Sequence, residues 1–264
     1  MSLRDAFDMT DRVAVVTGSG QGIGRAIAGG LADFGCDLVL IARRISDLEQ
    51  TAAGVRDRGR RAFVVDGDIR DFSETLAQRA VDEFGRLDIW VNNVGGSDEK
   101  ATRPLVDTPD DTFRAQLELN LTSAFQGCKA AATRMTNGGA IVNISSGAGT
   151  RGSPSTGPYA AAKAGMNNMT QTLALELAPH IRVNGVAPGP VVTEAFRQIL
   201  TDDPDKLAEI TASVPLGRSG TPDDIAAAVV YLASDAASWV TGQLILVAGG
   251  RTHRVVAYAP KDNE

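Results

Sequence analysis

The sequence predicts an α/β fold in which a doubly wound, mainly parallel sheet of seven strands carries helices on both faces. Short β-branched, apolar runs alternate along the chain with longer amphipathic stretches. Most of the short runs are continuously apolar, as expected for strands that are buried on both faces. No linker or low-complexity segment divides the 264 residues, so we expect one domain over residues 1–250 and a polar tail over residues 251–264.

The predicted elements follow one another in β-then-α order, which predicts right-handed crossovers. The strands are expected at Val13–Thr17, Leu38–Ala42, Ala62–Val65, Asp88–Asn92, Ala140–Ser145, Arg182–Val186 and Leu244–Val247. The helices are expected at Ile23–Phe34, Asp47–Arg58, Glu74–Phe84, Asp110–Met135, Tyr159–Leu177 and Asp223–Ala233. An irregular insertion is expected over Thr193–Pro215.

Several helix starts carry recognisable signals. Two pairs have the spacing of a capping box, Ser46 with Glu49 and Asp71 with Glu74. The tetrapeptide Thr-Pro-Asp-Asp occurs at Thr108–Asp111 and again at Thr221–Asp224. We interpret both copies as a threonine N-cap with proline at the first helical position, rather than as an internal repeat.

Composition excludes several classes of protein. Hydrophobic residues make up 43% and charged residues 22%, which excludes a disordered chain, a collagen-like chain and a disulfide scaffold. The net charge is −6 and no basic stripe is present, so we expect neither nucleic acid nor an anionic membrane as a partner. Cys36 and Cys128 both fall in apolar segments and are expected to be buried free thiols.

We expect a cytoplasmic protein without a metal centre. The first residues, MSLRDAFDMTDR, lack the apolar region of a secretory signal. The longest wholly apolar run, Ile225–Ala233, is far shorter than the ~20 residues of a membrane-spanning helix. Two histidines, His180 and His253, are too few for a His-rich metal site.

A glycine-rich turn follows the first predicted strand. Glycines permit a tight turn and a close approach of backbone N–H groups to a pyrophosphate, and the next helix adds its positive end. No Gly-Lys-Ser/Thr follows, so the turn is not a Walker A loop. We therefore predict a Rossmann-type dinucleotide site that includes Gly18, Ser19, Gln21, Gly22, Ile23 and Gly24.

The end of the second strand indicates which dinucleotide is bound. NAD-selective proteins place Asp or Glu about 20 residues beyond the glycines, to accept from the ribose 2′-OH. Here Arg43 and Arg44 occupy that place, and the first carboxylate is Asp47. A guanidinium suits a 2′-phosphate, so NADP is predicted, with NAD as the alternative. The less favoured interpretation is that the arginine pair is solvated at the start of a loop. Asp68 could bind the adenine amino group or could equally only cap a turn.

Tyr159 and Lys163 are four residues apart near the start of a predicted helix, so they share one face. An ammonium beside a phenol favours the phenolate, so we expect a lowered pKa for Tyr159 and a role in proton transfer. Ser146 ends the preceding strand at the edge where doubly wound sheets bind ligands. Asn120 is a poor helix former inside a predicted helix, and could hold a water molecule or the lysine.

Together these residues resemble the short-chain dehydrogenase/reductase family, over about Asp11 to Gly250. The family's motifs are matched by Thr17-Gly18-x-x-x-Gly22-x-Gly24, by Asn92-Asn93-Val94-Gly95, by Pro188-Gly189 with Thr193, and by the tetrad Asn120, Ser146, Tyr159 and Lys163. The resemblance extends the expected cofactor site to Ile69, Asn93, Gly95, Pro188, Gly189, Val191 and Thr193. Two departures are Val94, where alanine is usual, and Ala248-Gly249-Gly250, where Asp-Gly-Gly is usual.

The resemblance implies an NAD(P)-dependent oxidoreductase of alcohols and carbonyls that needs no metal. Tyr159 would exchange a proton with the substrate oxygen, which Ser146 would orient. Lys163 would bind the nicotinamide ribose and lower the pKa of Tyr159, and Asn120 would hold a water molecule linking Lys163 to solvent. The resemblance also implies a homo-oligomer, a tetramer, with the helices predicted at Asp110–Met135 and Tyr159–Leu177 at an interface.

Substrate specificity is expected in the segments Gly95–Pro104, Gly147–Pro158 and Thr193–Pro215. The last segment is apolar enough for a lid over a bulky hydrophobic ketone or secondary alcohol, although it could also be a helix packed on its own domain; its apolar residues are Phe196, Ile199, Leu200, Leu207, Ile210 and Val214. The chain resembles both bacterial hydroxysteroid dehydrogenases and 3-oxoacyl-carrier-protein reductases, and both remain open.

Two other classes of function are alternatives to an oxidoreductase. A non-catalytic dinucleotide-binding sensor is the alternative, and the intact tetrad argues against it. A serine hydrolase is disfavoured because the sequence has no Gly-x-Ser-x-Gly motif.

Overall fold

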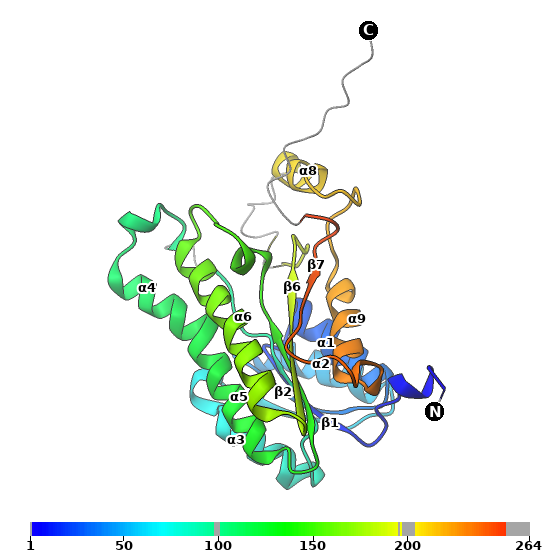
Figure 1. The fold of residues 1–264 in the computed structure, drawn as a ribbon. Coiled ribbons are helices and arrows are strands. Elements are labelled where there is room, and N and C mark those ends of the chain that lie inside the picture. Colours follow the sequence, from blue (N-terminus) through cyan, green and yellow to red (C-terminus); the bar gives the residue numbers. More distant parts are fainter. Residues whose placement is uncertain (1, 98–100, 195, 197–203, 252–264) are drawn as a thin grey trace.

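The computed structural model describes residues 2–97, 101–194, 196 and 204–251. Seven strands form one sheet in the order β3-β2-β1-β4-β5-β6-β7, and every neighbouring pair is parallel (Figure 1). The strands are β1 (Val13–Thr17), β2 (Asp37–Ala42), β3 (Ala62–Asp66), β4 (Ile89–Asn92), β5 (Gly139–Ile144), β6 (Ile181–Pro188) and β7 (Leu244–Val247). The predicted doubly wound α/β fold is confirmed, and all seven strands lie within two residues of their expected ends.

Helices cover both faces of the sheet. One face carries α1 (Gly22–Asp33), α2 (Ile45–Arg56) and α9 (Pro222–Ala233). The other face carries α3 (Ile69–Phe84), α5 (Ser123–Arg134) and α6 (Gly157–Leu177). Short 3-10 turns lie at Asp5–Phe7, Leu105–Asp107, Gly147–Thr150 and Asp235–Ala237.

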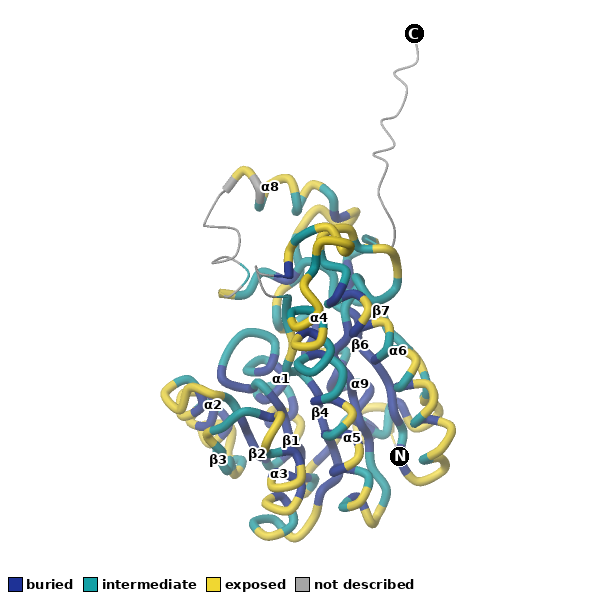
Figure 2. Tube along the Cα trace, turned by 90° about the vertical axis from the view of Figure 1, so that its left-hand side faces the viewer, coloured by how far each residue is buried: buried dark blue, intermediate teal, exposed yellow. Residues whose placement is uncertain are grey.

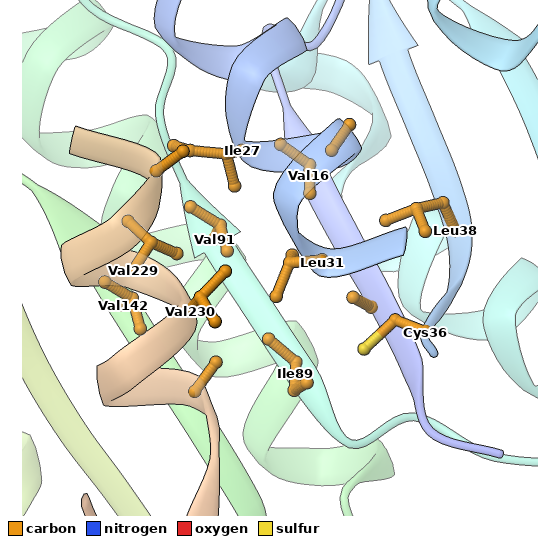
Figure 3. Close-up of a cluster of buried hydrophobic side chains, with 14 of the residues drawn as sticks. Val16, Ile27, Leu31, Cys36, Leu38, Ile89, Val91, Val142, Val229 and Val230 are labelled. Atoms are coloured by element: carbon orange, nitrogen blue, oxygen red, sulfur yellow. The ribbon is translucent and has the colours of Figure 1, made fainter. Parts of the chain in front are cut away.

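Alternate side chains of strands β1 to β6 enter two separate cores. Val16 of β1, Leu31 of α1 and Val229 of α9 belong to the first core, which Figure 3 shows between the sheet and these two helices. Val15 of β1 belongs to the second core, together with the fully buried Trp90 of β4. Figure 2 shows the central strands buried and the outer sides of the helices exposed. The continuous apolar runs in the sequence therefore arise because both faces of the strands are covered.

Cys36 and Cys128 are free and buried, as the sequence predicted. Burial raises the pKa of each thiol to about 12, so both are protonated near neutral pH. No helix of the described residues combines the length and the apolar character needed to cross a bilayer.

Three of the four predicted helix caps are wrong. Helix α3 begins at Ile69, because the Asp68 carboxylate accepts from the N–H of Arg70, so Asp71 and Glu74 lie inside the helix. Helix α2 begins at Ile45, before the predicted Ser46 cap, and no side chain caps it. Helix α4 (Asp110–Leu117) begins after Pro109, and the Thr108 hydroxyl donates to the carbonyl of Pro104.

The second Thr-Pro-Asp-Asp copy behaves as predicted. Thr221 and Asp224 form a reciprocal capping box at the start of α9, with Pro222 in the first turn. The Arg218 guanidinium beside Asp224 holds the pKa of that carboxyl well below its usual range.

The helix expected over Asp110–Met135 is interrupted. Between α4 and α5 the chain forms a π-helical turn over Glu118–Thr122, with Asn120 at its centre. Such single wide turns inside α-helices are rare and are frequent at functional sites.

The segment Thr193–Pro215, expected to be irregular, contains helix α8 (Pro204–Ala212). Ile199 and Leu200, two of the predicted lid residues, lie outside the described residues, and so does the tail beyond Arg251.

Candidate active site

A cleft of about 970 Å³ lies at the carboxyl ends of the central strands. It extends from the glycine turn after β1, past the segments after β4 and β5, to Pro188 at the end of β6. β2 and β3 lie on one side of β1, and β4 lies on the other, so the strand order reverses at β1. Open α/β sheets bind their ligands at such a switch point.

The structure brings most of the predicted site residues to this cleft. Its lining includes Gly18, Gln21, Gly22, Ile23, Gly24, Arg43, Arg44, Asp68, Ile69, Asn93, Gly95, Ser146, Tyr159, Lys163, Pro188, Gly189, Val191 and Thr193. Ser19 and Asn120 are the two predicted residues that lie outside the lining. Ser19 is fully buried, and both its N–H and its hydroxyl donate to the carbonyl of Ile41 in β2.

The glycine turn is compact because its two ends touch. A Cβ on Gly24 would lie 2.2 Å from the carbonyl oxygen of Gly18, so only glycine fits there. Thr51 of α2 donates to the carbonyl of Ser19 at 2.9 Å, and Arg25 donates to that of Gly20 at 3.1 Å. These bonds satisfy two carbonyls of the turn. The first N–H groups of α1 have no acceptor within the helix and remain suited to an anion.

Asn93 ties the end of β4 to this turn. Its Nδ2 donates to the carbonyls of Thr17 and Gly18 at 2.9 and 3.2 Å. Its backbone N–H donates to the Thr17 hydroxyl at 2.9 Å. The side chain of Asn93 therefore fixes the floor of the cleft beside the glycine turn.

Charged side chains surround the end of the cleft near β2 and β3. Arg44 pairs with Asp47 at 2.5 Å and donates to Gln21 at 2.6 Å. Arg70 donates twice to the carboxylate of Asp68, at 2.8 and 3.0 Å. Arg43 is exposed, lines the cleft and forms no ion pair with a described residue.

Asp68 caps α3, as one of its two interpretations proposed, and the pairing with Arg70 lowers its pKa. Arg70 and Asp47 line the cleft but were not predicted as site residues. The sequence contains a signal for each of them. Arg70 is a charged residue two positions after Asp68, and Asp47 is a charged residue that follows Arg43 and Arg44.

Tyr159 and Lys163 lie one turn apart on α6, and the Ser146 hydroxyl interacts with the Tyr159 phenol. Burial raises the pKa of Tyr159, and the hydrogen bond with Ser146 lowers it by less. Lys163 is buried, its Nζ donates to the carbonyl of Ile144 at 2.8 Å, and burial lowers its pKa to about 7.

The expectation that Lys163 lowers the pKa of Tyr159 is therefore wrong for this geometry. The Lys163 Nζ lies 5.8 Å from the centre of the tyrosine ring. Burial raises the pKa of Tyr159, and the group that partly offsets this rise is Ser146 rather than Lys163. In this site the effect of burial on the pKa of Tyr159 is larger than the effect of the groups that lower it.

Asn120 is fully buried and binds the backbone of the segment after β4. Its Oδ1 accepts from the N–H of Gly96 at 2.8 Å, and its Nδ2 donates to the Gly96 carbonyl at 3.0 Å. A Cβ on Gly95 would lie 2.7 Å from Asn120 Oδ1 and 2.9 Å from Lys163 Nζ, so these two groups flank the same glycine. Gln116, one turn earlier, contacts Asn120 and lines the cleft, and it was not predicted.

No group of three or more His, Cys, Asp or Glu side chains in the described part of the chain could hold a metal ion. Fold and cleft together define a class: α/β proteins that hold a dinucleotide at a glycine turn and place a Ser, Tyr and Lys cluster beside it.

A family model described as enoyl-(acyl carrier protein) reductase matches residues 18–252. The chain is 40% identical over 247 residues to cis-4-hydroxycyclohexanecarboxylate dehydrogenase of Sinomonas cyclohexanicum, covering 92% of this chain and 97% of that protein. It is 35% identical over 256 residues to 7alpha-hydroxysteroid dehydrogenase of Escherichia coli, covering 93% and 96% of the two chains. The chain belongs to the short-chain dehydrogenase/reductase family, whose members are oxidoreductases that act on CH–OH groups, and the predicted resemblance is confirmed.

Solved structures agree with this assignment. A 7alpha-hydroxysteroid dehydrogenase complexed with NADH and 7-oxo glycochenodeoxycholic acid has a TM-score of 0.88 at 33% identity, covering 95% of this chain and 98% of that one. A putative NAD(P)-dependent gluconate 5-dehydrogenase from Beutenbergia cavernae with bound NADP has a TM-score of 0.85 at 37% identity, covering 93% and 98%.

Proposed function

We propose that the protein interconverts a ketone and a secondary alcohol with a nicotinamide dinucleotide, and that Tyr159 is its general acid and base. The observation that carries the proposal is that Ser146, Tyr159 and Lys163 line the same cleft as the glycine turn. Two hydroxyls that line one cleft can both hydrogen-bond to a single substrate oxygen.

The residues present fit a dinucleotide. The amides at the start of α1 suit a pyrophosphate, and the cleft continues from there to Tyr159. When bound, the nicotinamide supplies or accepts the hydride. The far side of the nicotinamide would be lined by Pro188, which ends β6, and by Gly189, Val191 and Thr193, which follow it at the same edge.

Each catalytic side chain then has one task. Tyr159 gives a proton to the carbonyl oxygen during reduction, or removes it from the alcohol during oxidation. Ser146 holds that oxygen, and Lys163 binds the nicotinamide ribose. Asn120 keeps the Gly95–Gly96 backbone beside Lys163 through its two hydrogen bonds to Gly96, and its predicted water molecule remains part of the proposal.

We propose NADP as the preferred dinucleotide and NAD as the alternative. Arg44 is already bound to Asp47, whereas Arg43 at the same end of the cleft is exposed and unpaired among the described residues. A free guanidinium there suits a 2′-phosphate. The solved relatives contain NADH in one case and NADP in another, so the choice rests on Arg43.

We propose a bulky hydrophobic substrate such as a hydroxysteroid. Leu119 and Phe196 add apolar surface to the cleft, and a hydroxysteroid dehydrogenase is among the relatives. A 3-oxoacyl-[acyl-carrier-protein] reductase remains the second candidate, favoured by the carrier-protein description of the matching family model. A non-catalytic dinucleotide sensor is the candidate from another class.

We also propose that the chain acts in the cytoplasm as a homo-oligomer, a tetramer by resemblance. Phe125 of α5 and Leu175 of α6 are 48% and 83% exposed, and burial of such apolar side chains against another copy would stabilise an assembly. The two free thiols fit a reducing compartment.

Replacement of Tyr159 by Phe tests the proposed chemistry. The variant keeps the ring and loses the phenol, so we expect turnover of secondary alcohols and ketones to fall at least 100-fold. NADPH affinity, measured by fluorescence titration, should change less than threefold. Retained turnover would refute Tyr159 as the proton donor. A wild-type protein that binds NADPH and turns over no member of a broad panel would favour the sensor.

A further inference from the structure

The chain segment that carries Ser146 is docked directly on the helix that carries Tyr159. After β5 the chain passes through Ser145 and Ser146 into the 3-10 turn Gly147–Thr150. A Cβ on Gly149 would lie 2.7 Å from the carbonyl carbon of Lys163, so the turn touches the backbone of α6. The position of the serine hydroxyl relative to the phenol therefore depends on how this turn is seated.

One side chain of α6 binds the turn on both sides of Ser146. The Ser145 hydroxyl donates to Asn167 Oδ1 at 2.5 Å, and Asn167 Nδ2 donates to the carbonyl of Gly149 at 3.0 Å. The bonds use the acceptor and the donor of one amide, and no carboxylate or hydrocarbon side chain can supply both. Asn167 lies one turn beyond Lys163 on α6 and does not line the cleft.

The neighbouring hydrogen bonds have other roles than the two bonds of Asn167. Lys163 Nζ binds the carbonyl of Ile144 and so holds the end of β5. The Ser146 hydroxyl accepts from the N–H of Ala148, a bond within the turn. Ser145 also approaches the Lys163 carbonyl, at 3.4 Å, but the same hydroxyl makes its shorter bond to Asn167.

We propose that Asn167 is a positioning residue that fixes the Ser146 hydroxyl against the Tyr159 phenol by holding the Ser145–Gly149 turn on α6. The inference rests on the proposed function, because it assigns Asn167 to the reaction through Ser146. Asn167 touches neither the cleft nor the reacting atoms, so its contribution is geometric.

The proposal predicts a change that loss of stability alone would not produce. The hydrogen bond from Ser146 lowers the pKa of Tyr159, whereas burial raises it. If the turn is loosened, Ser146 no longer lowers the pKa of Tyr159, while burial still raises it. Alcohol oxidation needs the Tyr159 phenolate as base, so its rate rises with pH as the phenol loses its proton. This rise should occur at a higher pH in the variant than in the wild type.

The experiment compares Asn167→Ala with Asn168→Ala. Asn168 is the next residue of α6 and is exposed, so it controls for the loss of an asparagine from this helix. Initial rates are measured from pH 6 to 10 with NADP⁺ and NAD⁺, with cyclohexanol and a hydroxysteroid as probes. For Asn167→Ala we expect kcat to fall about 10- to 100-fold, the range that misplacement by about 1 Å can cause. NADPH affinity and the melting temperature should stay close to those of Asn168→Ala.

Two further measurements complete the test. Ultraviolet titration of the phenolate, with Tyr159→Phe to identify the Tyr159 transition, should show a higher pKa in Asn167→Ala whether or not either probe is turned over. Ser145→Ala should lower kcat in the wild type and add little in the Asn167→Ala background, since the bond between Ser145 and Asn167 is already absent there.

The outcomes separate the two proposals. If Tyr159→Phe is inactive but Asn167→Ala matches Asn168→Ala in kcat, pH profile and phenolate titration, Asn167 has no positioning role. If Tyr159→Phe stays active, the proposed function itself fails. A drop in kcat that follows a loss of folded protein, without a shift in the phenolate titration, would also overturn the positioning role.

Discussion

The buried Lys163 makes the stability of the protein depend on pH in a direction opposite to that of most lysines. Its pKa is about 7 in the folded chain and about 10.4 in an unfolded chain. Between these values the unfolded state binds one more proton than the folded state, so this group makes stability rise with pH. The contribution is complete above pH 10.4 and is lost as the pH falls to 7.

The size of the effect follows from proton linkage. Where only the unfolded state is protonated, the slope is about 1.4 kcal/mol per pH unit. Integration between pH 7.5 and 9, with the folded value of about 7, gives about 2 kcal/mol. Lys163→Met keeps the length of the side chain and removes the titrating group. Between pH 7.5 and 9, the free energy of unfolding of the wild type should rise by about 2 kcal/mol relative to that of this variant.

Urea unfolding without dinucleotide measures this difference. Wild type and Lys163→Met are unfolded at pH 7.5, 8.25 and 9, at one protein concentration because an oligomer is stabilised by mass action. Lys129→Met is the control, since Lys129 is exposed on α5. A difference between wild type and Lys163→Met that stays constant over the pH range would show that Lys163 remains protonated in the folded protein.

Two other expectations concern the cofactor and the assembly. Arg43→Ala should weaken NADPH binding at least tenfold more than NADH binding, because only NADPH carries the 2′-phosphate; equal losses, measured by isothermal titration, would refute this role of Arg43. Light scattering should give about four times the mass of one chain, and a monomer would contradict the proposed homo-oligomer.

The sheet could be predicted closely from the sequence because its strands are buried on both faces. Runs such as Val13–Thr17 are apolar throughout and leave few alternatives. Helix ends were harder, because several residues compete to cap each helix. Asp68 begins α3 and places the predicted cap Asp71 inside it. Periodicity does not reveal which carboxylate reaches a free N–H group.

The site residues could be chosen from the sequence, but their contacts could not. Asn120 could be recognised as a poor helix former, but the sequence does not show that the chain forms a π-helical turn around it. Asn167 carried no motif, and its two bonds appear only when α6 lies against the turn after β5. Contacts between distant segments depend on register and depth that single-sequence patterns do not contain.

The electrostatics of Tyr159 illustrate this limit and show what the site depends on. Spacing along a helix placed an ammonium beside the phenol, and attraction alone predicts a lowered pKa. The structure adds burial, which raises the pKa of Tyr159 and lowers that of Lys163. The Lys163 Nζ is bound to the Ile144 carbonyl, so the interaction that favours the phenolate comes from Ser146. The acid–base strength of Tyr159 therefore depends on how firmly the turn that carries Ser146 is held against α6.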